Sequence, residues 1–233
     1  MLTLPIIAVV PATPRARIVR LGLNGHTFEF AAGQAVLIGT HGQDVRKPYS
    51  IASAPEDAQR DAHIELLIGV RENGAPGEHL TLEPGTAVDV EGPVGGFTFP
   101  LEPVERNFVF VAGGTGIAPL RAMLRHAILG RRQARHVGLL YSARTPDEFA
   151  FADEFRAMAA DGTIDFAQTI TRETDRDWDG HRGRITRDHL RHLVHAPDTL
   201  CFISGPRALV EDMPRLLEEL GVTRDRIRIE EWG

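Results

Sequence analysis

Hydrophobic and polar positions follow different periods in the two halves of the chain. In roughly the first hundred residues, short β-rich runs alternate with clusters of Gly and Pro. This pattern predicts strands at Ile6–Val10, Ala16–Leu23, Gln34–Ile38, Tyr49–Ala52, His63–Val70 and Ala87–Val90. Several short strands at about ten-residue spacing indicate a β-barrel or a β-sandwich.

From Phe108 onward, apolar runs of strand length alternate with helical runs. The predicted strands are Phe108–Ala112, Val137–Tyr141, Asp165–Thr169, Leu200–Ile203 and Ile227–Glu230, and the predicted helices are Ala118–Leu129, Asp147–Ala160, Arg187–His195 and Arg207–Leu220. This alternation is typical of βαβ units around a parallel sheet with both faces covered. Leu101–Glu105 separates the two patterns. We therefore expect two domains, an antiparallel β-barrel over residues 1–103 and an α/β parallel-sheet domain over residues 104–233.

A glycine-rich turn joins the first strand and the first helix of the second half. Residues 113–119 read GGTGIAP. Glycines let backbone N–H groups approach a pyrophosphate, and the helix dipole favours negative charge at this end. Pro119 suits the first helical turn, although it stands where the G-x-G-x-x-G pattern has its third glycine. The turn indicates a phosphate site, and the alternative is a tight βα turn that needs only flexible residues.

Two segments of the first half carry groups that suit a planar cofactor. Residues 46–53 read RKPYSIAS, and on a strand Tyr49 and Ser50 point to opposite sides. The Tyr49 ring can then stack on a flat group while the hydroxyl reaches its edge, and Arg46 and Lys47 can meet a phosphate. Residues 92–97 read GPVGGF. Either segment alone is also compatible with an ordinary edge strand or loop.

Taken in order, these segments resemble the ferredoxin–NADP⁺ reductase family of flavoproteins over nearly the whole chain. The motifs are AGQ at 32–34, KPYS at 47–50, GPVGGF at 92–97, GGTGIAP at 113–119, SGP at 204–206 and EEW at 230–232. The resemblance implies an FAD-binding barrel followed by a nicotinamide nucleotide-binding domain, without a fused iron–sulfur domain. FAD is favoured over FMN because the G-P-x-G-x-F turn belongs with FAD-type relatives.

The resemblance also implies roles for single residues. Tyr49 would stack on the isoalloxazine, Ser50 would hydrogen-bond near flavin N5, and Lys47 with Arg46 would face the flavin phosphate. Ser204 and Glu230 would act with Ser50 as catalytic residues beside the nicotinamide. Further cofactor contacts are expected from Pro48, Ile68, Val70, Gly74, Gly77, Gly92, Pro93, Gly95, Gly96, Phe97, Gly114, Thr115, Gly116, Pro119, Gly205, Pro206 and Trp232.

Three positions depart from the family pattern. Lys47 stands where Arg is usual, which replaces a bidentate fork by a point charge. Gly77 stands where relatives often have a serine at the flavin pyrophosphate. Ser204 replaces a cysteine beside the nicotinamide.

We expect NADPH as the nucleotide, with NADH as the alternative. Ser142 and Arg144 follow the strand Val137–Tyr141, where the adenosine ribose would lie. An arginine there suits a 2′-phosphate, whereas an NAD site usually has an acidic residue. Arg172 and Arg184 resemble arginines that bind this phosphate in NADPH-linked relatives. The alternative is that these arginines are solvated surface charges.

Composition argues against several classes of protein. A net charge of −6 argues against a nucleic-acid surface, and the apolar runs are too short to span a membrane. The single cysteine, Cys201, excludes an internal disulfide and an iron–sulfur cluster built from this chain's own thiolates. No positive charge precedes Leu4, so we expect no signal peptide and a cytoplasmic protein.

The histidines show no metal-ligand spacing. His189, His192 and His195 recur every third residue on a predicted helix, where they could form a ligand face. A solvated polar face is the preferred interpretation, because no cysteine or carboxylate joins them at the required spacing. We therefore expect no metal site.

These observations predict an oxidoreductase that passes electrons from NADPH through FAD to a separate carrier protein, such as a ferredoxin, a flavodoxin or an oxygenase component. One alternative is a reductase of small acceptors such as free flavin or ferric complexes. Another is a non-catalytic, nucleotide-sensing module of the same fold. The retained Ser50, Glu230 and GGTGIAP loop argue against the last alternative, but the sequence does not separate the first two.

Overall fold

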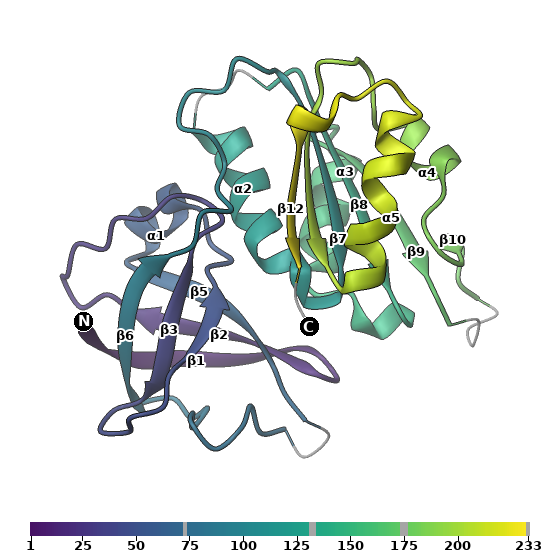
Figure 1. The fold of residues 1–233 in the computed structure, drawn as a ribbon. Helices are drawn as coiled ribbons and strands as arrows, with labels where there is room; N and C mark the ends of the chain where they lie inside the picture. Colours follow the sequence, from purple (N-terminus) through teal and green to yellow (C-terminus); the bar gives the residue numbers. More distant parts are fainter. Residues whose placement is uncertain (72–73, 131–133, 173–176, 232–233) are drawn as a thin grey trace.

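The computed structural model describes residues 1–71, 74–130, 134–172 and 177–231 and folds them into two six-stranded sheets (Figure 1). One sheet is antiparallel and the other is parallel with helices on both faces. The predicted fold class is therefore confirmed. Within the described residues, no helix combines the length and the apolar character that crossing a membrane requires.

The first sheet curls into a barrel. Its strands, in the spatial order β4-β3-β6-β1-β2-β5, are β1 (Leu2–Thr13), β2 (Ala16–Gly22), β3 (Ala35–Thr40), β4 (Lys47–Ser50), β5 (His63–Gly69) and β6 (Ala87–Val94). The Ile51–Leu66 bridge, just past the end of β4, joins the two outer strands of this order. Apolar residues such as Val36, Ile38 and Ile64 fill the interior.

The pattern of hydrophobic positions did not predict one short helix of the barrel domain. Helix α1 (Pro55–Asp61) follows β4 and precedes β5. Its first turn carries Pro55 and two acidic residues, which are helix-start signals. Seven residues are too few for an apolar period to appear, so only these terminal signals could have identified the helix.

The second sheet is parallel throughout, in the order β10-β9-β8-β7-β11-β12. Its strands are β7 (Asn107–Gly113), β8 (His136–Ala143), β9 (Asp165–Ile170), β10 (His181–Arg182), β11 (Leu200–Gly205) and β12 (Ile227–Glu231). Its helices are α2 (Ile117–Leu129), α3 (Ala152–Ala160), α4 (Arg187–Arg191) and α5 (Arg207–Glu218). Alternate residues of β7 pack on opposite sides, Phe110 in the core with α2 and Val111 in the core with α5.

Two helices are much shorter than predicted, and α5 ends at Glu218, two residues before the predicted Leu220. In place of one helix from Asp147 to Ala160, a 3-10 turn at Pro146–Glu148 precedes α3, and Phe151 between them adopts a left-handed φ of 59°. The break allows Phe149 to pack against Tyr141 at a ring-centroid distance of 4.9 Å. Helix α4 ends at Arg191 rather than at His195, so the three histidines spaced along the predicted helix do not share one helical face.

Chain order reverses at the centre of the parallel sheet. Strand β7 has β8 on one side and β11 on the other, so the loops that follow β7 and β11 diverge to opposite faces. In open α/β sheets, ligands bind at the carboxyl ends of the strands at such a switch point. This edge is therefore the expected place for a ligand.

Buried ion pairs from α2 join the two sheets. The Arg121 guanidinium donates to Glu65 of β5 at 2.8 Å, to the Ala52 carbonyl at 2.8 Å and to Glu154 of α3 at 2.7 Å. One turn later, Arg125 pairs with Asp57 of α1 and with Glu154. Helix α2 is thereby fixed to the barrel and to its own domain at the same time.

The arginines also keep these carboxyl groups ionised. Burial opposes ionisation of Glu65, but the charge and hydrogen bonds of Arg121 and Arg20 outweigh it and lower the pKa of Glu65. Burial likewise opposes ionisation of Asp57, and Arg125 outweighs it, so the pKa of Asp57 is lowered as well. A lowered carboxyl pKa stabilises the folded state above the unfolded pKa of about 4, and that stability is lost as the pH falls below it.

Replacing Arg121 by Met should lower the free energy of unfolding by about 3 kcal/mol, because the buried Glu65 loses its buried cation and is left with Arg20, whose side chain is 42% exposed. The measurement is urea unfolding at pH 7. Arg156→Met is the matched control, since Arg156 is half-exposed, pairs with Asp153 on the same helix and donates one long hydrogen bond of 3.5 Å to Gln168. The control should change stability by less than about 0.5 kcal/mol. The difference between wild type and Arg121→Met should shrink below about pH 4, where Glu65 gains a proton. Equal stability of wild type and Arg121→Met at pH 7 would contradict the role given to this residue.

Candidate functional site

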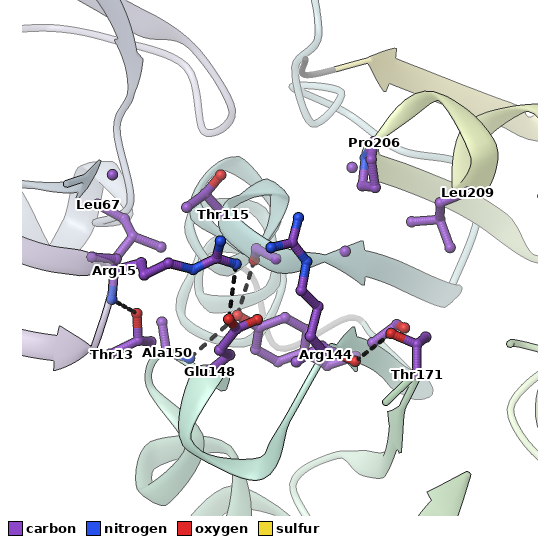
Figure 2. A pocket seen from close by; sticks show the side chains of 18 of the residues that line it. Thr13, Arg15, Leu67, Thr115, Arg144, Glu148, Ala150, Thr171, Pro206 and Leu209 are labelled. Atoms are coloured by element: carbon purple, nitrogen blue, oxygen red, sulfur yellow. Dashed lines mark hydrogen bonds and ion pairs between the residues drawn. The ribbon is translucent and has the colours of Figure 1, made fainter. Parts of the chain in front are cut away.

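A cleft of about 700 Å³ lies between the barrel and the carboxyl edge of the parallel sheet (Figure 2). The wall of the cleft on the parallel-sheet domain is formed by the loops that follow β7, β8, β9 and β11. The barrel side is formed by the β1–β2 hairpin tip and the end of β5. The cleft therefore opens at the switch point of the parallel sheet, where ligands are expected.

The glycines after β7 lie where side chains would collide with β11 or fill the cleft. A Cβ on Gly116 would lie 2.3 Å from the Ser204 carbonyl oxygen, and a Cβ on Gly113 would lie 2.8 Å from the Pro206 ring. Gly114 has a left-handed φ of 55° and open space in front of it. A bare backbone thus faces the cleft at the N-terminus of α2, which is a favourable geometry for an anion.

A buried tyrosine fixes this loop. The Tyr141 hydroxyl donates to the Gly114 carbonyl at 2.9 Å and accepts from the Ala150 N–H at 3.3 Å. Burial raises the pKa of Tyr141, so the hydroxyl keeps its proton. One residue therefore joins the loop after β7 to the loop after β8, a role that the sequence reading did not include.

Some of the predicted nucleotide contacts meet in the cleft. Its lining includes Gly114, Thr115, Ser142, Arg144, Arg184, Gly205 and Pro206, together with Val70 from the barrel. Arg172 is not part of the lining, although its backbone N–H donates to the Arg144 carbonyl at 2.9 Å. Gly116 and Pro119 are buried at the start of α2, so they shape the loop rather than face the cleft.

The sequence did not predict one cation of the cleft, Arg15. Arg15, at the β1–β2 hairpin tip, pairs with Glu148 of the nucleotide domain at 2.8 Å. In Figure 2 the guanidinium groups of Arg15 and Arg144 extend toward the same part of the cleft. The sequence gives no signal for this contact, because Arg15 reads only as part of a turn between two strands.

The flavin motif on β4 has the expected alternation. Tyr49 is partly buried against the barrel, while Ser50 turns to the other side of the strand and is buried. The Tyr49 hydroxyl shares a hydrogen bond of 2.9 Å with Nε2 of His79, and the two rings are nearly parallel. Burial, together with the nearby charge of Lys47, lowers the pKa of His79, which keeps this ring neutral at pH 7. His79 lies two residues after Gly77 and was also missed.

The two cations before this motif differ in their surroundings. Lys47 is exposed on β4, whereas Arg46 lies 3.5 Å from Asp89, a carboxylate that also accepts a hydrogen bond from Thr3. Lys47 is therefore the freer cation for a phosphate.

The segment at residues 92–97, predicted as a turn, lies next to this motif, but its first three residues belong to β6 and the turn begins only at Gly95. Ala35 pairs with Ser50 on one side and with Val94 on the other, which brings the turn beside β4. Gln34 donates to the Gly95 carbonyl at 3.3 Å and holds the turn in place. Gly95 and Gly96 are exposed with open space in front of them, while the Phe97 ring packs on Phe202 of β11.

Other predicted residues are placed as follows. Pro48 is exposed on β4, Gly74 and Gly77 lie in the loop after β5, and the Ile68 side chain points into the barrel core, so only its backbone could meet a cofactor. Ser204 and Glu230 are paired residues on β11 and β12. Trp232 lies outside the described residues.

The residues present fit both FAD and a nicotinamide nucleotide. Ser204 Oγ and His79 Nδ1 are buried side-chain atoms without a hydrogen-bond partner, and each lies within a segment that the family resemblance assigns to a cofactor. Buried polar atoms in folded proteins are normally paired, so unpaired ones near a cleft or a cofactor motif are suited to a ligand.

Two family models match the chain in order. The model described as oxidoreductase FAD-binding domain matches residues 5–99, and the model described as oxidoreductase NAD-binding domain matches residues 110–215. Both matches agree with the division into a barrel and a parallel sheet.

Individual proteins match along most of their length. The chain is 35% identical to ferredoxin--NADP reductase B of Sorangium cellulosum over 240 residues, which cover 97% of this chain and 96% of that protein. Its fold is similar to the crystal structure of the Amycolatopsis cytochrome P450 reductase GcoB, with a TM-score of 0.82, 27% identity, and coverage of 98% of this chain and 68% of that chain. A ferredoxin NADP⁺ reductase from Neisseria gonorrhoeae with bound FAD and NADP has the same fold, with a TM-score of 0.81, 21% identity, and coverage of 99% and 98%.

A relative of this identity over nearly the full length, together with both oxidoreductase domains in the expected order, shows that the chain belongs to the ferredoxin–NADP⁺ reductase family of FAD- and nicotinamide-dependent oxidoreductases.

Proposed function

We propose that this protein takes hydride from NADPH onto FAD and delivers the electrons one at a time to a separate carrier protein. The observation that carries the proposal is the cleft in which the Gly114–Thr115 backbone, at the N-terminus of α2, faces the cations Arg144 and Arg184. A helix N-terminus and arginines are the groups that bind phosphates of a dinucleotide.

Each domain has a distinct task in this proposal. The barrel would hold the flavin with the Tyr49 ring, the Ser50 hydroxyl, the Lys47 ammonium and the open backbone at Gly95–Gly96. The parallel sheet would orient the nucleotide, with Ser204 and Glu230 beside the nicotinamide. FAD, when bound, accepts two electrons as hydride and can release them singly.

NADPH is proposed over NADH because of the positive side chains in the cleft. Arg144 and Arg184 line the cleft, and Arg15 adds a third cation from the barrel. NADH is the competing proposal, and Glu148 is the observation that favours it, because an acidic residue near the end of β8 can bind the ribose 2′-hydroxyl. In this structure Glu148 is engaged by Arg15, which favours NADPH.

A carrier protein is proposed as the acceptor because the chain's single cysteine provides no iron–sulfur cluster of its own. Relatives named a ferredoxin–NADP reductase and a cytochrome P450 reductase support an external protein acceptor.

The discriminating measurement is stopped-flow reoxidation of the NADPH-reduced protein by ferredoxin, flavodoxin, cytochrome c and free FMN in turn. Fastest reoxidation by ferredoxin or flavodoxin is expected. Fastest reoxidation by free FMN would favour a reductase of small acceptors, and no reduction by either nucleotide would favour a non-catalytic module.

Ser50→Ala should lower the rate of flavin reduction on the order of 10²-fold and leave flavin content unchanged, because a hydroxyl donor at the reacting edge is lost. Tyr49→Ala should lower flavin content instead, because it removes a stacking surface. Tyr49→Phe is the matched control, since it keeps the ring and loses only the bond to His79. Flavin content is read from the absorbance of the released cofactor, and the reduction rate from single-turnover kinetics. Wild-type reduction by Ser50→Ala would show that this strand does not face the reacting atoms.

Arg144→Ala should raise the KM for NADPH about 5- to 100-fold with little change for NADH, because one contact to a 2′-phosphate is lost from a solvent-accessible site. Arg224→Ala, an exposed arginine outside the cleft lining, is the control. The preference for NADPH should decrease as salt screens the phosphate contacts.

Glu148→Gln separates the two nucleotide proposals. It releases Arg15 and should lower the KM for NADPH if the cations bind a 2′-phosphate. A higher KM for NADH in this variant, with NADPH unaffected, would support the competing proposal.

A further inference from the structure

Three potential metal ligands meet at the edge of the parallel sheet opposite the cleft. His136 begins β8, Asp165 begins β9, and His195 follows α4. Their ligand atoms all lie within 4.8 Å of one another. His195 Nε2 and Asp165 Oδ2 are 3.0 Å apart, and the rings of His136 and His195 have centroids 4.3 Å apart.

The fold holds the three residues in this arrangement. His136 and Gly138 are two residues apart on β8 and point to the same face, and Gly138 pairs with Asp165 on β9. A Cβ on Gly138 would lie 3.1 Å from Cβ of Leu193, so glycine permits the chain after α4 to approach this face closely. Leu193 is buried there, and its N–H donates to the Leu190 carbonyl at 2.9 Å. The turn that carries His195 is thus packed onto the sheet beside the other two ligands.

The ligand chemistry selects one class of ion. Two imidazoles and one carboxylate suit Zn²⁺ and similar borderline divalent ions, whereas Mg²⁺ and Ca²⁺ prefer all-oxygen sets. With bond lengths of about 2.0–2.2 Å, ligand atoms of a tetrahedral Zn²⁺ lie about 3.3 Å apart, so side-chain movements of about 1.5 Å or less bring these ligand atoms to that spacing. The Asp165 and His195 side chains are 54% and 38% exposed, which leaves room for water as a fourth ligand.

We propose that His136, Asp165 and His195 form a binding site for a Zn²⁺-class divalent ion. The ion would replace the proton shared between Asp165 and His195 and tie the chain after α4 to strands β8 and β9. The site lies at the amino ends of these strands, while the cleft lies at their carboxyl ends, so the ion would stabilise the nucleotide domain without touching the reacting groups.

The test is calorimetric titration of EDTA-treated, flavin-loaded protein with ZnCl₂ in a non-chelating buffer. Wild type should bind one equivalent, and His195→Ala and Asp165→Asn should each lower the affinity more than tenfold, since loss of a supporting residue alone typically costs 10- to 100-fold. His192→Ala is the matched control, because His192 is an exposed histidine of the same segment outside the cluster. It should bind Zn²⁺ as wild type does.

A second control addresses the histidines elsewhere in the chain. The rings of His181 and His189 lie 4.3 Å apart, so His189→Ala tests whether that pair takes up the ion instead. Zn²⁺ should also raise the thermal unfolding midpoint of wild type and of His192→Ala but not of His195→Ala. The proposal is overturned if wild type binds no Zn²⁺, if His195→Ala and Asp165→Asn bind it as wild type does, or if only His189→Ala loses it.

Discussion

The position of the site depends on the contacts that the buried Arg121 guanidinium makes with the barrel and with α3. Arg121 lies in the middle of α2, donates to Glu65 and to the Ala52 carbonyl in the barrel, and also pairs with Glu154. The N-terminus of the same helix presents the glycine loop to the cleft. One helix therefore sets the position of the glycine loop relative to the barrel. Because a buried charge without its partner is costly, this arrangement has few alternatives of similar energy.

The charges of the cleft are already partly compensated without a nucleotide. Arg15 pairs with Glu148 at 2.8 Å, and Arg184 lies 3.8 Å from Asp212. In the proposed function, a nucleotide phosphate would have to compete with these carboxylates for the two arginines. Arg15 comes from the barrel, so its pair with Glu148 is also a bond across the mouth of the cleft (Figure 2). A nucleotide bound as proposed above would compete with this contact between the barrel and the parallel-sheet domain.

Buried polar atoms without partners occur close to the groups assigned to cofactors. The Ser204 backbone lies against Gly116 of the glycine loop, and the ring that carries His79 Nδ1 hydrogen-bonds Tyr49 through its other nitrogen. An unpaired buried polar atom costs about 1–3 kcal/mol, which a ligand or an ordered water can recover. The protein thus leaves part of its hydrogen-bonding capacity unused near the places where the family binds FAD and the nucleotide.

The sequence by itself determined the two-part fold, the glycine loop at the start of α2 and the alternation of Tyr49 and Ser50, because periodicity and glycine requirements act between neighbouring residues. The sequence predicted the ends of helices less well. The chain breaks before α3 where Phe149 packs against Tyr141, and this contact is not visible in the local pattern of residues. The tertiary structure alone decided which distant side chains meet. Arg15 with Glu148, Tyr49 with His79, and His136 with Asp165 and His195 are brought together by strand register and domain packing. No local pattern encodes these contacts, because each joins segments that are far apart in the chain.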